Sequence, residues 1–428
     1  MGKADVLEEE ETTSVIPLNF VYLQLLLNIQ EMNIRKITER VFYVGINDRT
    51  TVKFENLWPL PYGVSYNSYL VKGTEKVALI DAVEESFIRL LLSNVGEIVD
   101  NCKIDYLVVN HMEPDHSGCI PTLLELFPDI KIVGNKITLG MLKGFYDISE
   151  DHCIEIKEND VIDLGDVSLK FFMTPLVHWP ETMMTYVEEE RVLFSGDAFG
   201  CFGALNGGII DNEMEVDWYF PEMYRYYSNI VGRFGKPVQM ALKKLENIKI
   251  DYICSTHGPI WKDKIKEVKD LYNRMSLYEG EEGVTIVYGT MYGNTGEIAD
   301  IIASRLCERG IRNIKIHNVS KSEMSYIISD AFRYKGLIVG SPTYNGHIFP
   351  AIGEFMTSME VREIKNKVIA TFGSFTWASA ACKMMNDCMA RLKMTPVASM
   401  DMKQGPSASD YEAAKELADK VADALKNN

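Results

Sequence analysis

Hydrophobic and polar positions follow two different patterns in the two parts of this chain. From about Ile34 to Trp261, short apolar runs alternate with charged, periodic stretches such as 84–98, which predicts strands with interspersed helices. Residues 262–279 have the pattern of one more helix, and the charged, glycine-bounded stretch 280–283 predicts a linker. The apolar, β-rich runs of this first part lie at residues 68–71, 77–80, 106–109, 169–173 and 192–194.

After the predicted linker the pattern becomes a regular alternation of strands and helices. Strand-like runs are separated by helical stretches of 10 or more residues, and the chain ends in an amphipathic helix over 409–427. This alternation predicts a doubly wound parallel sheet with right-handed crossovers. The strand-like runs are 284–288, 314–318, 336–340, 367–372 and 395–398.

Length and charge narrow the class of protein. The chain has 428 residues, too many for one ordinary core, so its length agrees with two domains. Its 61 acidic and 44 basic side chains leave a net charge of -17, which repels nucleic acid and anionic membranes, and we expect neither as a partner. No two of the cysteines have CxxC spacing. This predicts the reduced thiols of a cytoplasmic protein and argues against a built-in rubredoxin or zinc ribbon.

Residues 1–31 are predicted to be an N-terminal extension. Their apolar run, residues 15–29, is short for a membrane-spanning helix and is interrupted by amide side chains. Glutamates at positions 8–11 precede it, the wrong charge for a signal peptide. We interpret the run either as a docking helix or as a segment translated before an intended start at Met32.

Histidines and carboxylates follow several of the predicted strands. The strand at 106–109 runs into the sequence NHMEPDHSG, in which potential metal ligands alternate. Further candidates follow three later strands, in the same kind of position. Loops at strand ends can aim such side chains at a shared point, which predicts a metal site. The candidate ligands are His111, Glu113, Asp115, His116, His178, Asp197 and His257.

Three loops of the second part predict a phosphate and flavin site. The first joins a strand to a helix with hydroxyls and backbone N–H groups that can cradle a phosphate, and it lacks the lysine of a Walker loop. It resembles the FMN-phosphate loop of flavodoxins. All three lie at the edge where open α/β sheets bind ligands, and two aromatic side chains there can stack on a flavin. The candidate FMN-binding residues are Thr290, Met291, Tyr292, Gly293, Asn294 and Thr295, then Pro342, Thr343, Tyr344, Asn345 and Gly346, then Gly373, Ser374, Phe375, Thr376 and Trp377, with Tyr344 and Trp377 as the stacking pair.

The order HxExDH followed by H, D and H resembles the flavodiiron proteins of the metallo-β-lactamase superfamily. Hydrolases of that superfamily have histidine where this chain has Glu113, and a carboxylate favours iron over zinc. The stretch 56–70 and the sequence HWPETM at 178–183 are also similar to that family. The resemblance implies a metallo-β-lactamase-like αββα sandwich over 32–279 and a flavodoxin-like domain over 284–428. It also implies one iron on His111, Glu113 and His178, a second on Asp115, His116 and His257, and Asp197 as the bridge.

The resemblance also implies an activity. FMN would take electrons from an external donor, either a rubredoxin-like protein or a reduced cofactor or reductase. The electrons would pass to the two irons, where dioxygen is reduced to water, nitric oxide to nitrous oxide, or both. Members of the family form head-to-tail homodimers, or dimers of such dimers, in which the FMN of one subunit faces the irons of the other.

Two other functions compete with this interpretation. The first is a metal-dependent hydrolase fused to a flavodoxin domain, which predicts zinc and a metal-bound hydroxide. Glu113 argues against it. The second is a noncatalytic electron carrier or gas sensor. The complete set of candidate ligands argues against that alternative, because a carrier has no need of a second, metal-loaded site.

Overall fold

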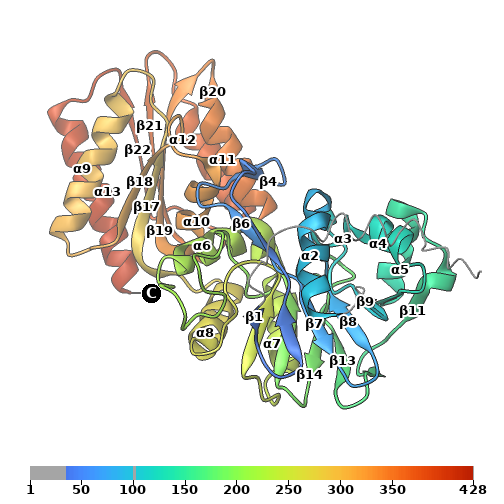
Figure 1. The fold of residues 1–428 in the computed structure, drawn as a ribbon. Coiled ribbons are helices and arrows are strands. Elements are labelled where there is room, and N and C mark those ends of the chain that lie inside the picture. Colours follow the sequence, from blue (N-terminus) through green and yellow to red (C-terminus); the bar gives the residue numbers. More distant parts are fainter. Residues whose placement is uncertain (1–34, 100–102, 428) are drawn as a thin grey trace, which may run out of the picture.

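The computed structural model describes residues 35–99 and 103–427, which form two α/β units (Figure 1). The predicted extension at residues 1–31 lies outside the described residues. No helix within the described ranges is long and apolar enough to cross a membrane.

Two facing sheets form the first unit. Apolar side chains from both sheets, among them Tyr69, Val108, Phe171 and Phe194, share one buried core between them. The first sheet contains, in spatial order, β1 (Arg35–Lys36), β2 (Val41–Tyr43), β7 (Tyr69–Lys72), β8 (Val77–Ile80), β9 (Tyr106–Val108), β10 (Lys131–Gly134) and β11 (Cys153–Glu155). The second contains β12 (Val161–Asp163), β13 (Ser168–Met173), β14 (Met183–Val187), β15 (Val192–Gly196) and β16 (Tyr252–Ser255).

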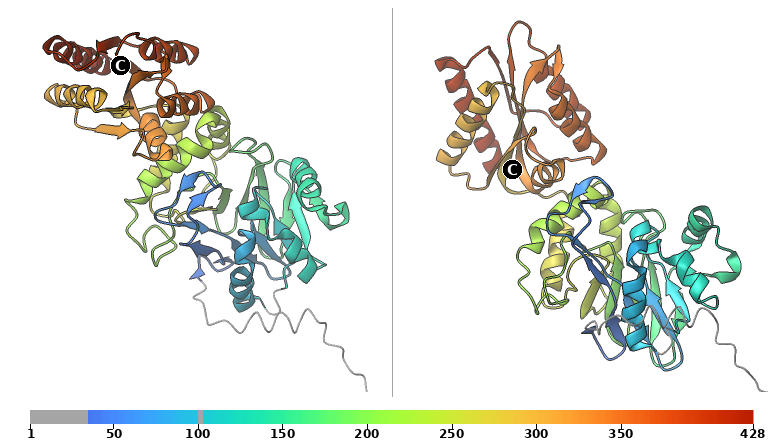
Figure 2. Two further views of the ribbon diagram at one scale, coloured as in Figure 1. Left: turned by 90° about the horizontal axis from the view of Figure 1, so that it is seen from above. Right: turned by 45° about the horizontal axis from the view of Figure 1, so that its top comes forward.

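Helices cover the outer faces of these sheets, which gives four layers (Figures 1 and 2). On the first sheet lie η1 (Glu85–Phe87), α2 (Ile88–Ile98), α3 (Pro114–Ser117), α4 (Ile120–Leu126), α5 (Lys136–Tyr146) and η3 (Glu150–His152). The second carries α6 (Tyr219–Tyr226), η4 (Tyr227–Val231), η5 (Gly232–Phe234), α7 (Gly235–Lys244) and α8 (Ile265–Ser276). Two short ribbons pair β3 (Ile46–Asp48) with β6 (Val64–Tyr66) and β4 (Lys53–Phe54) with β5 (Trp58–Pro59).

The second unit is built on one parallel sheet. Its strands are, in spatial order, β18 (Ile314–Asn318), β17 (Glu281–Tyr288), β19 (Tyr334–Tyr344), β21 (Val368–Phe375) and β22 (Ala398–Lys403), and β20 (His347–Ile348) pairs antiparallel with the end of β19. One face carries α9 (Asn294–Glu308) and α13 (Ala408–Lys426), and the other carries α10 (Met324–Arg333), α11 (Pro350–Val361) and α12 (Ala381–Arg391) (Figure 1). The order reverses between β17 and β19, so the predicted doubly wound parallel sheet is confirmed.

Three details of the sequence prediction are wrong. The stretch 280–283 was assigned to a linker, but Glu281 already pairs with Tyr334 at the start of β17. The last strand begins at Ala398, not at residue 395, and one reason is that Pro396 has no N–H to donate to a ladder. The loops expected at 340–346 and 373–377 are shorter, because β19 and β21 continue to Tyr344 and Phe375.

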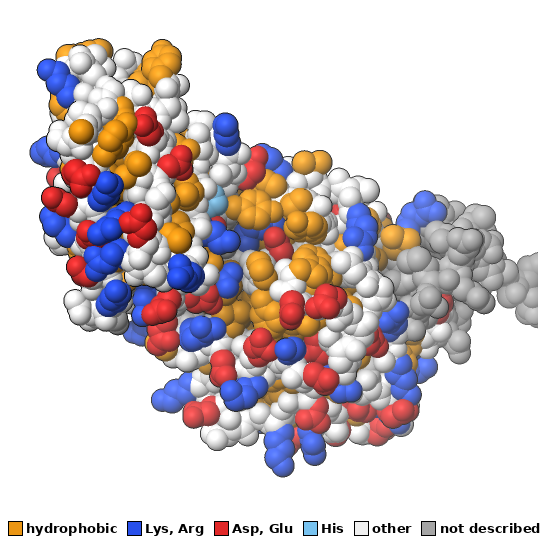
Figure 3. Space-filling view, turned by 90° about the vertical axis from the view of Figure 1, so that its left-hand side faces the viewer, with side chains coloured by type: hydrophobic (Ala, Val, Ile, Leu, Met, Phe, Trp, Pro, Cys, Tyr) orange, Lys and Arg blue, Asp and Glu red, His pale blue; other side chains and the backbone are white. Residues whose placement is uncertain are grey.

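Buried polar contacts join the two units. The Tyr224 hydroxyl donates to Glu281 at 2.6 Å, and Arg333 donates to the other oxygen of that carboxylate at 2.8 Å. Arg225 is fully buried, and its guanidinium donates to Glu222 of the first unit and to the Ser325 hydroxyl of the second. In the space-filling view, hydrophobic side chains gather in the middle of one face, between the upper lobe and the lower body (Figure 3).

Candidate functional site

The seven candidate ligands lie together at strand ends between the two facing sheets. His111, Glu113, Asp115 and His116 follow β9 in the first sheet, where Pro114 begins the short helix α3. The other three come from the second sheet. His178 lies in the connection from β13 to β14, Asp197 directly follows β15, and His257 follows β16.

The first group of side chains is His111, Glu113, His178 and one oxygen of Asp197. Nε2 of His178 lies 3.2 Å from Oε2 of Glu113 and 3.1 Å from Oδ2 of Asp197. Nε2 of His111 lies 3.2 Å and 3.5 Å from the same two oxygens. These four ligand atoms are all within 4.8 Å of one another, close enough to share one metal ion.

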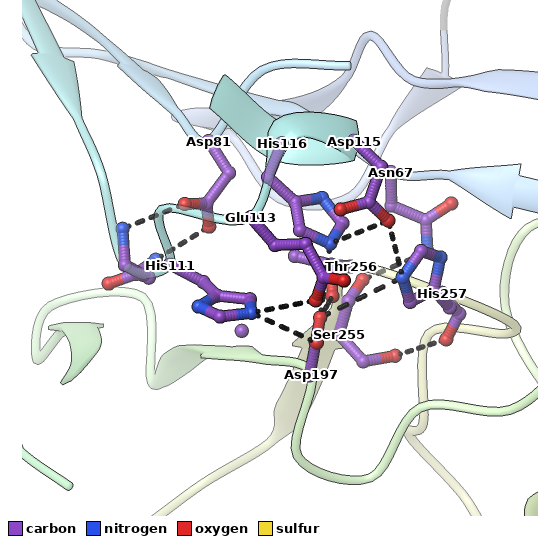
Figure 4. A network of polar contacts seen from close by, with 12 residues as sticks. Asn67, Asp81, His111, Glu113, Asp115, His116, Asp197, Ser255, Thr256 and His257 are labelled. Atoms are coloured by element: carbon purple, nitrogen blue, oxygen red, sulfur yellow. Dashed lines mark hydrogen bonds and ion pairs between the residues drawn. The ribbon is translucent and has the colours of Figure 1, made fainter. Parts of the chain in front are cut away.

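The second group is Asp115, His116 and His257. Nε2 of His116 and Nε2 of His257 lie 3.2 Å and 3.3 Å from Oδ2 of Asp115. The same two nitrogens lie 3.1 Å and 3.7 Å from Oδ1 of Asp197. Asp197 therefore presents one carboxylate oxygen to each group, and the side chains converge on it (Figure 4).

Burial and missing partners show that this cluster is built for a cation. His111, His116, His257 and Asp197 are at most 2% exposed. Both oxygens of Asp115, and Nε2 of His116 and of His257, have no hydrogen-bond partner, although they face one another. Buried polar atoms normally have a partner, so the set fits metal ions that these atoms would coordinate.

The flavin candidates line a small hollow at the carboxyl edge of the parallel sheet. Thr290 accepts a hydrogen bond from the Gly293 N–H at 3.0 Å, and Gly293 has a φ of 103°, which brings the chain into the start of α9. The Thr295 hydroxyl lies 3.1 Å from that of Ser374 and so joins the first loop to the third. The hollow is lined by Thr290, Met291, Tyr292, Asn294, Thr295, Pro342, Thr343, Ser374, Phe375, Thr376 and Gln404.

The other predicted FMN-binding residues lie around this hollow and do not line it. Its volume is about 90 Å³, room for a few water molecules or a phosphate group. Trp377 is 86% exposed and Tyr344 is 43% exposed, so both rings are free to stack. Gly293, Asn345 and Gly346 belong to the turns around the hollow, and Gly373 lies within β21 beside it. Gln404 was missed by the sequence analysis, because it lies after the last strand, whose position was predicted too early.

The comparisons with known proteins match both units. An ODP family beta lactamase model matches residues 64–258, and a flavodoxin model matches residues 286–417. The chain is 33% identical over 364 residues to the anaerobic nitric oxide reductase flavorubredoxin of Escherichia coli O1:K1 / APEC, covering 84% of this chain and 76% of that protein. It is also 33% identical over 390 residues to an uncharacterized protein of Methanocaldococcus jannaschii, covering 90% of this chain and 98% of that protein. The chain belongs to the flavodiiron protein family.

A solved structure agrees with this assignment. Rubredoxin oxygen:oxidoreductase from Desulfovibrio gigas superposes with a TM-score of 0.88 at 28% identity, covering 92% of this chain and 99% of that one. The flavodiiron protein is therefore an oxidoreductase with a metallo-β-lactamase-like domain followed by a flavodoxin domain, and its cofactors are FMN and two iron ions. The predicted fold class, enzyme class and cofactors are confirmed.

The ionisation of the metal-free cluster in this flavodiiron protein follows from its carboxylates. Burial opposes protonation of His116 and His178, but the facing carboxylates outweigh it and raise the pKa of each imidazole to about 9. Burial also opposes ionisation of Asp197, yet His116 and His111 hold the pKa of this carboxyl well below its usual value. Protons on the imidazoles thus balance the carboxylate charge, which metal ions would balance when bound.

Outer partners fix the direction of the imidazoles. Nδ1 of His111 donates to Glu181 at 2.7 Å, and Nδ1 of His257 donates to the Ser65 carbonyl at 2.8 Å, so both Nε2 atoms face the cluster. The Thr256 hydroxyl donates to Oδ1 of Asp197. No motif in the sequence marks Ser65 or Thr256 as such a partner, whereas Glu181 lies within the stretch HWPETM that resembles the family.

Two further side chains near the cluster were also missed. Tyr226 is fully buried, its hydroxyl has no partner, and its ring lies 5.6 Å from that of His257. Glu55 lies beside Glu113, and burial together with that second carboxylate raises the pKa of Glu55 to about 7. Both residues are far from the ligands in sequence, and no local motif marks them.

Proposed function

We propose that this flavodiiron protein reduces dioxygen to water, nitric oxide to nitrous oxide, or both. Two relatives support both substrates, because one is a nitric oxide reductase and the other is an oxygen:oxidoreductase. The observation that carries the proposal is the position of Asp197, whose two oxygens face two separate groups of histidine and carboxylate ligands. That arrangement suits a pair of metal ions that act on one small substrate.

We assign the ligands by these two groups. His111, Glu113 and His178 would hold one iron, and Asp115, His116 and His257 would hold the other. Asp197 would serve both, because one of its oxygens faces each group. Glu113 supplies an oxygen ligand, which favours iron over zinc, and this argues against the hydrolase alternative. When bound, two ferrous ions supply electrons and open coordination positions for a diatomic gas.

The protein residues orient this centre and keep it apart from bulk water. Glu181 and the Ser65 carbonyl fix the imidazoles, and Thr256 fixes Asp197. Reduction of dioxygen to water takes four electrons and four protons, and reduction of two nitric oxide molecules to nitrous oxide and water takes two of each. Tyr226 is placed to offer a hydrogen bond near the centre, because its buried hydroxyl has no other partner.

We assign FMN to the hollow at the carboxyl edge of the parallel sheet. Hydroxyls of Thr290 and Thr295, with the N–H groups at the start of α9, hold the phosphate. The exposed rings of Tyr344 and Trp377 would be free to stack on the flavin. An external donor, a rubredoxin-like protein or a reduced cofactor or reductase, would supply its electrons.

Strand geometry supports electron transfer between two copies of the chain. β17 begins at Glu281, which contacts Tyr224 of the first domain, and runs away from that domain to the flavin edge. Its length is about 25 Å at roughly 3.3 Å per residue, so the proposed flavin edge lies about that far from this contact with the first domain. Tyr292 at that edge is 93% exposed, and a second copy in head-to-tail arrangement would cover it.

Anaerobic gas consumption by the reconstituted protein tests the proposed function. Protein loaded with two irons and one FMN per chain is reduced chemically and mixed with each gas, and loss of gas and formation of water or nitrous oxide are recorded. We expect rapid consumption of at least one gas, and none by the same protein loaded with zinc. No consumption by iron-loaded protein, together with a preference for zinc over iron, would favour the hydrolase.

A further inference from the structure

A short hairpin covers the metal cluster. Strands β4 and β5 pair Phe54 with Trp58, and the turn between them holds Glu55 and Asn56 at positive φ, 50° and 56°. Asparagine adopts this conformation fairly often, but glutamate seldom does, so surrounding contacts must hold it. We call residues 53–59 the roof hairpin.

The roof hairpin touches one proposed ligand in each metal group. The Phe54 ring is 4% exposed and meets the His257 ring edge to face, with centroids 5.3 Å apart. The next side chain, Glu55, lies against the carboxylate of Glu113. One two-stranded element therefore contacts both halves of the centre from the same side.

The outer side of the roof hairpin is held by the flavodoxin domain. Trp58 donates its indole N–H to Oε2 of Glu55 at 2.9 Å. The guanidinium of Arg362, at the end of α11, lies over the Trp58 ring at 5.1 Å from its centroid. Figure 1 shows β4 beside α11, although the two belong to different domains.

Arg362 has few other contacts that would explain its position. Its Nε is buried without a hydrogen-bond partner, and it donates one hydrogen bond, to the Ser358 carbonyl of its own helix at 3.2 Å. A guanidinium has five N–H donors, and a half-buried one normally uses more of them. Its contacts across the domain boundary are the Trp58 ring and the charge of Glu55.

We propose that Arg362 is a positioning residue for the metal centre of its own chain. It fixes Trp58 by stacking, Trp58 fixes Glu55 by its hydrogen bond, and Glu55 orients the iron ligand Glu113. The flavodoxin domain thus has a second role besides carrying FMN, because it holds the roof over the irons. This inference rests on the proposed function for the identity of the metal and for Glu113 as one of its ligands.

Arg362→Met and Trp58→Phe are the variants that test it. The first keeps an unbranched apolar stem and loses the cation, and the second keeps a ring and loses the N–H donor. Each is loaded with cobalt(II) in place of iron, and the visible absorption bands report the ligand geometry without any turnover. We expect shifted bands in both variants, and kcat/KM for the gas about tenfold lower in the iron forms at unchanged iron and FMN content.

Matched variants separate positioning from general damage. Arg391→Met removes an exposed arginine of the same domain, paired with Glu360, and should leave the bands and the activity unchanged. Arg362→Lys keeps a cation over the indole, so its cobalt bands and its activity should be close to those of the unaltered protein. The double variant should be no worse than Trp58→Phe alone, because both act along one path. Unshifted cobalt bands in Arg362→Met would overturn the inference. A double variant whose loss of activity is the product of the two single losses would overturn it as well. Abnormal cobalt bands in the unaltered protein would instead count against the proposed ligands.

Discussion

At the scale of single residues, the charge of Asp197 organises the cluster. It lies within 3.7 Å of Nε2 of His111, His116, His178 and His257, and it is 2% exposed. A buried carboxylate in this position is unfavourable unless cations surround it. Its role is therefore tied to the metal, and substitution should affect metal content before it affects the fold.

We expect Asp197→Ala to lose most of its iron, because neither half of the site keeps its shared ligand. Iron per chain, measured after reconstitution and desalting, should fall from two to below one, with FMN content unchanged. Asp197→Asn keeps the shape and the acceptor for Thr256 but loses the charge. Its iron content should therefore lie between those of the unaltered protein and of Asp197→Ala. Full iron occupancy in Asp197→Ala would contradict the bridging assignment.

Glu113→His tests the preference for iron. Replacing an oxygen ligand by imidazole makes the first group softer, so zinc should displace iron in a competition experiment and gas consumption should fall by at least about tenfold. Glu113→Gln serves as the control, because it removes charge without adding a nitrogen ligand. If Glu113→His kept two irons and full turnover, the argument from ligand type would be wrong.

The raised pKa values of His116 and His178 predict opposite effects of pH on metal-free and metal-loaded protein. In the metal-free form each imidazole has its pKa raised from 6.5 to about 9, so its stabilising effect is complete below pH 6.5 and is lost as pH rises through about 9. Thermal unfolding of metal-free protein should therefore move to lower temperature across this range. Metal affinity should instead rise, by about tenfold per pH unit for each proton displaced. A metal-free protein with constant Tm from pH 6.5 to 9.5 would contradict this.

At the scale of secondary structure elements, the strands before the metal ligands could be predicted from their apolar runs, whereas the ends of β19, β21 and β22 could not. β8 was predicted with its observed bounds, and the ligands at 111–116 follow the end of β9 as expected. The partners that orient those ligands could not be predicted in this way. Ser65 and Glu55 reach the cluster only through tertiary packing. Ser65 lies 192 residues before His257 in the sequence, and Glu55 lies 58 residues before Glu113. Hydrophobic periodicity contains no information about such distant contacts.

The start of α9 gives a prediction about FMN. Thr295 is 2% exposed and its hydroxyl lies beside that of Ser374 at the hollow. Thr295→Val removes a proposed donor to the FMN phosphate while keeping the shape of the side chain. Hydrogen bonds to charged groups contribute about 1.5–3 kcal/mol. FMN affinity, measured by fluorescence titration of the FMN-free protein, should fall roughly 10-fold to 150-fold. Thr285→Val on β17 is the control, because that buried hydroxyl has no partner in the structure and lies away from the hollow.

At the scale of the whole molecule, the two domains are joined firmly and yet keep their cofactor sites apart. Arg225 and Glu281 lock α6 against the base of the parallel sheet, so the flavin edge points away from the first domain of its own chain. A rigid junction of this kind leaves little freedom for the flavin to swing back toward the irons. Electrons must therefore cross to another copy if the proposed route is correct.

Subunit complementation tests that route. Asp197→Ala provides a copy that keeps FMN but lacks a complete pair of irons. Thr295→Val combined with Asn294→Ala provides a copy with both irons and weakened FMN binding. Each homodimer should be inactive at low FMN concentration. A heterodimer of the two copies is isolated by two different tags. In the head-to-tail arrangement it contains one working combination, in which the FMN of the first copy faces the irons of the second. It should therefore recover about half of the activity of the unaltered dimer. An inactive heterodimer with the expected iron and FMN content would show that electrons travel within one chain, and the arrangement inferred from strand direction and the exposed Tyr292 would have to be abandoned.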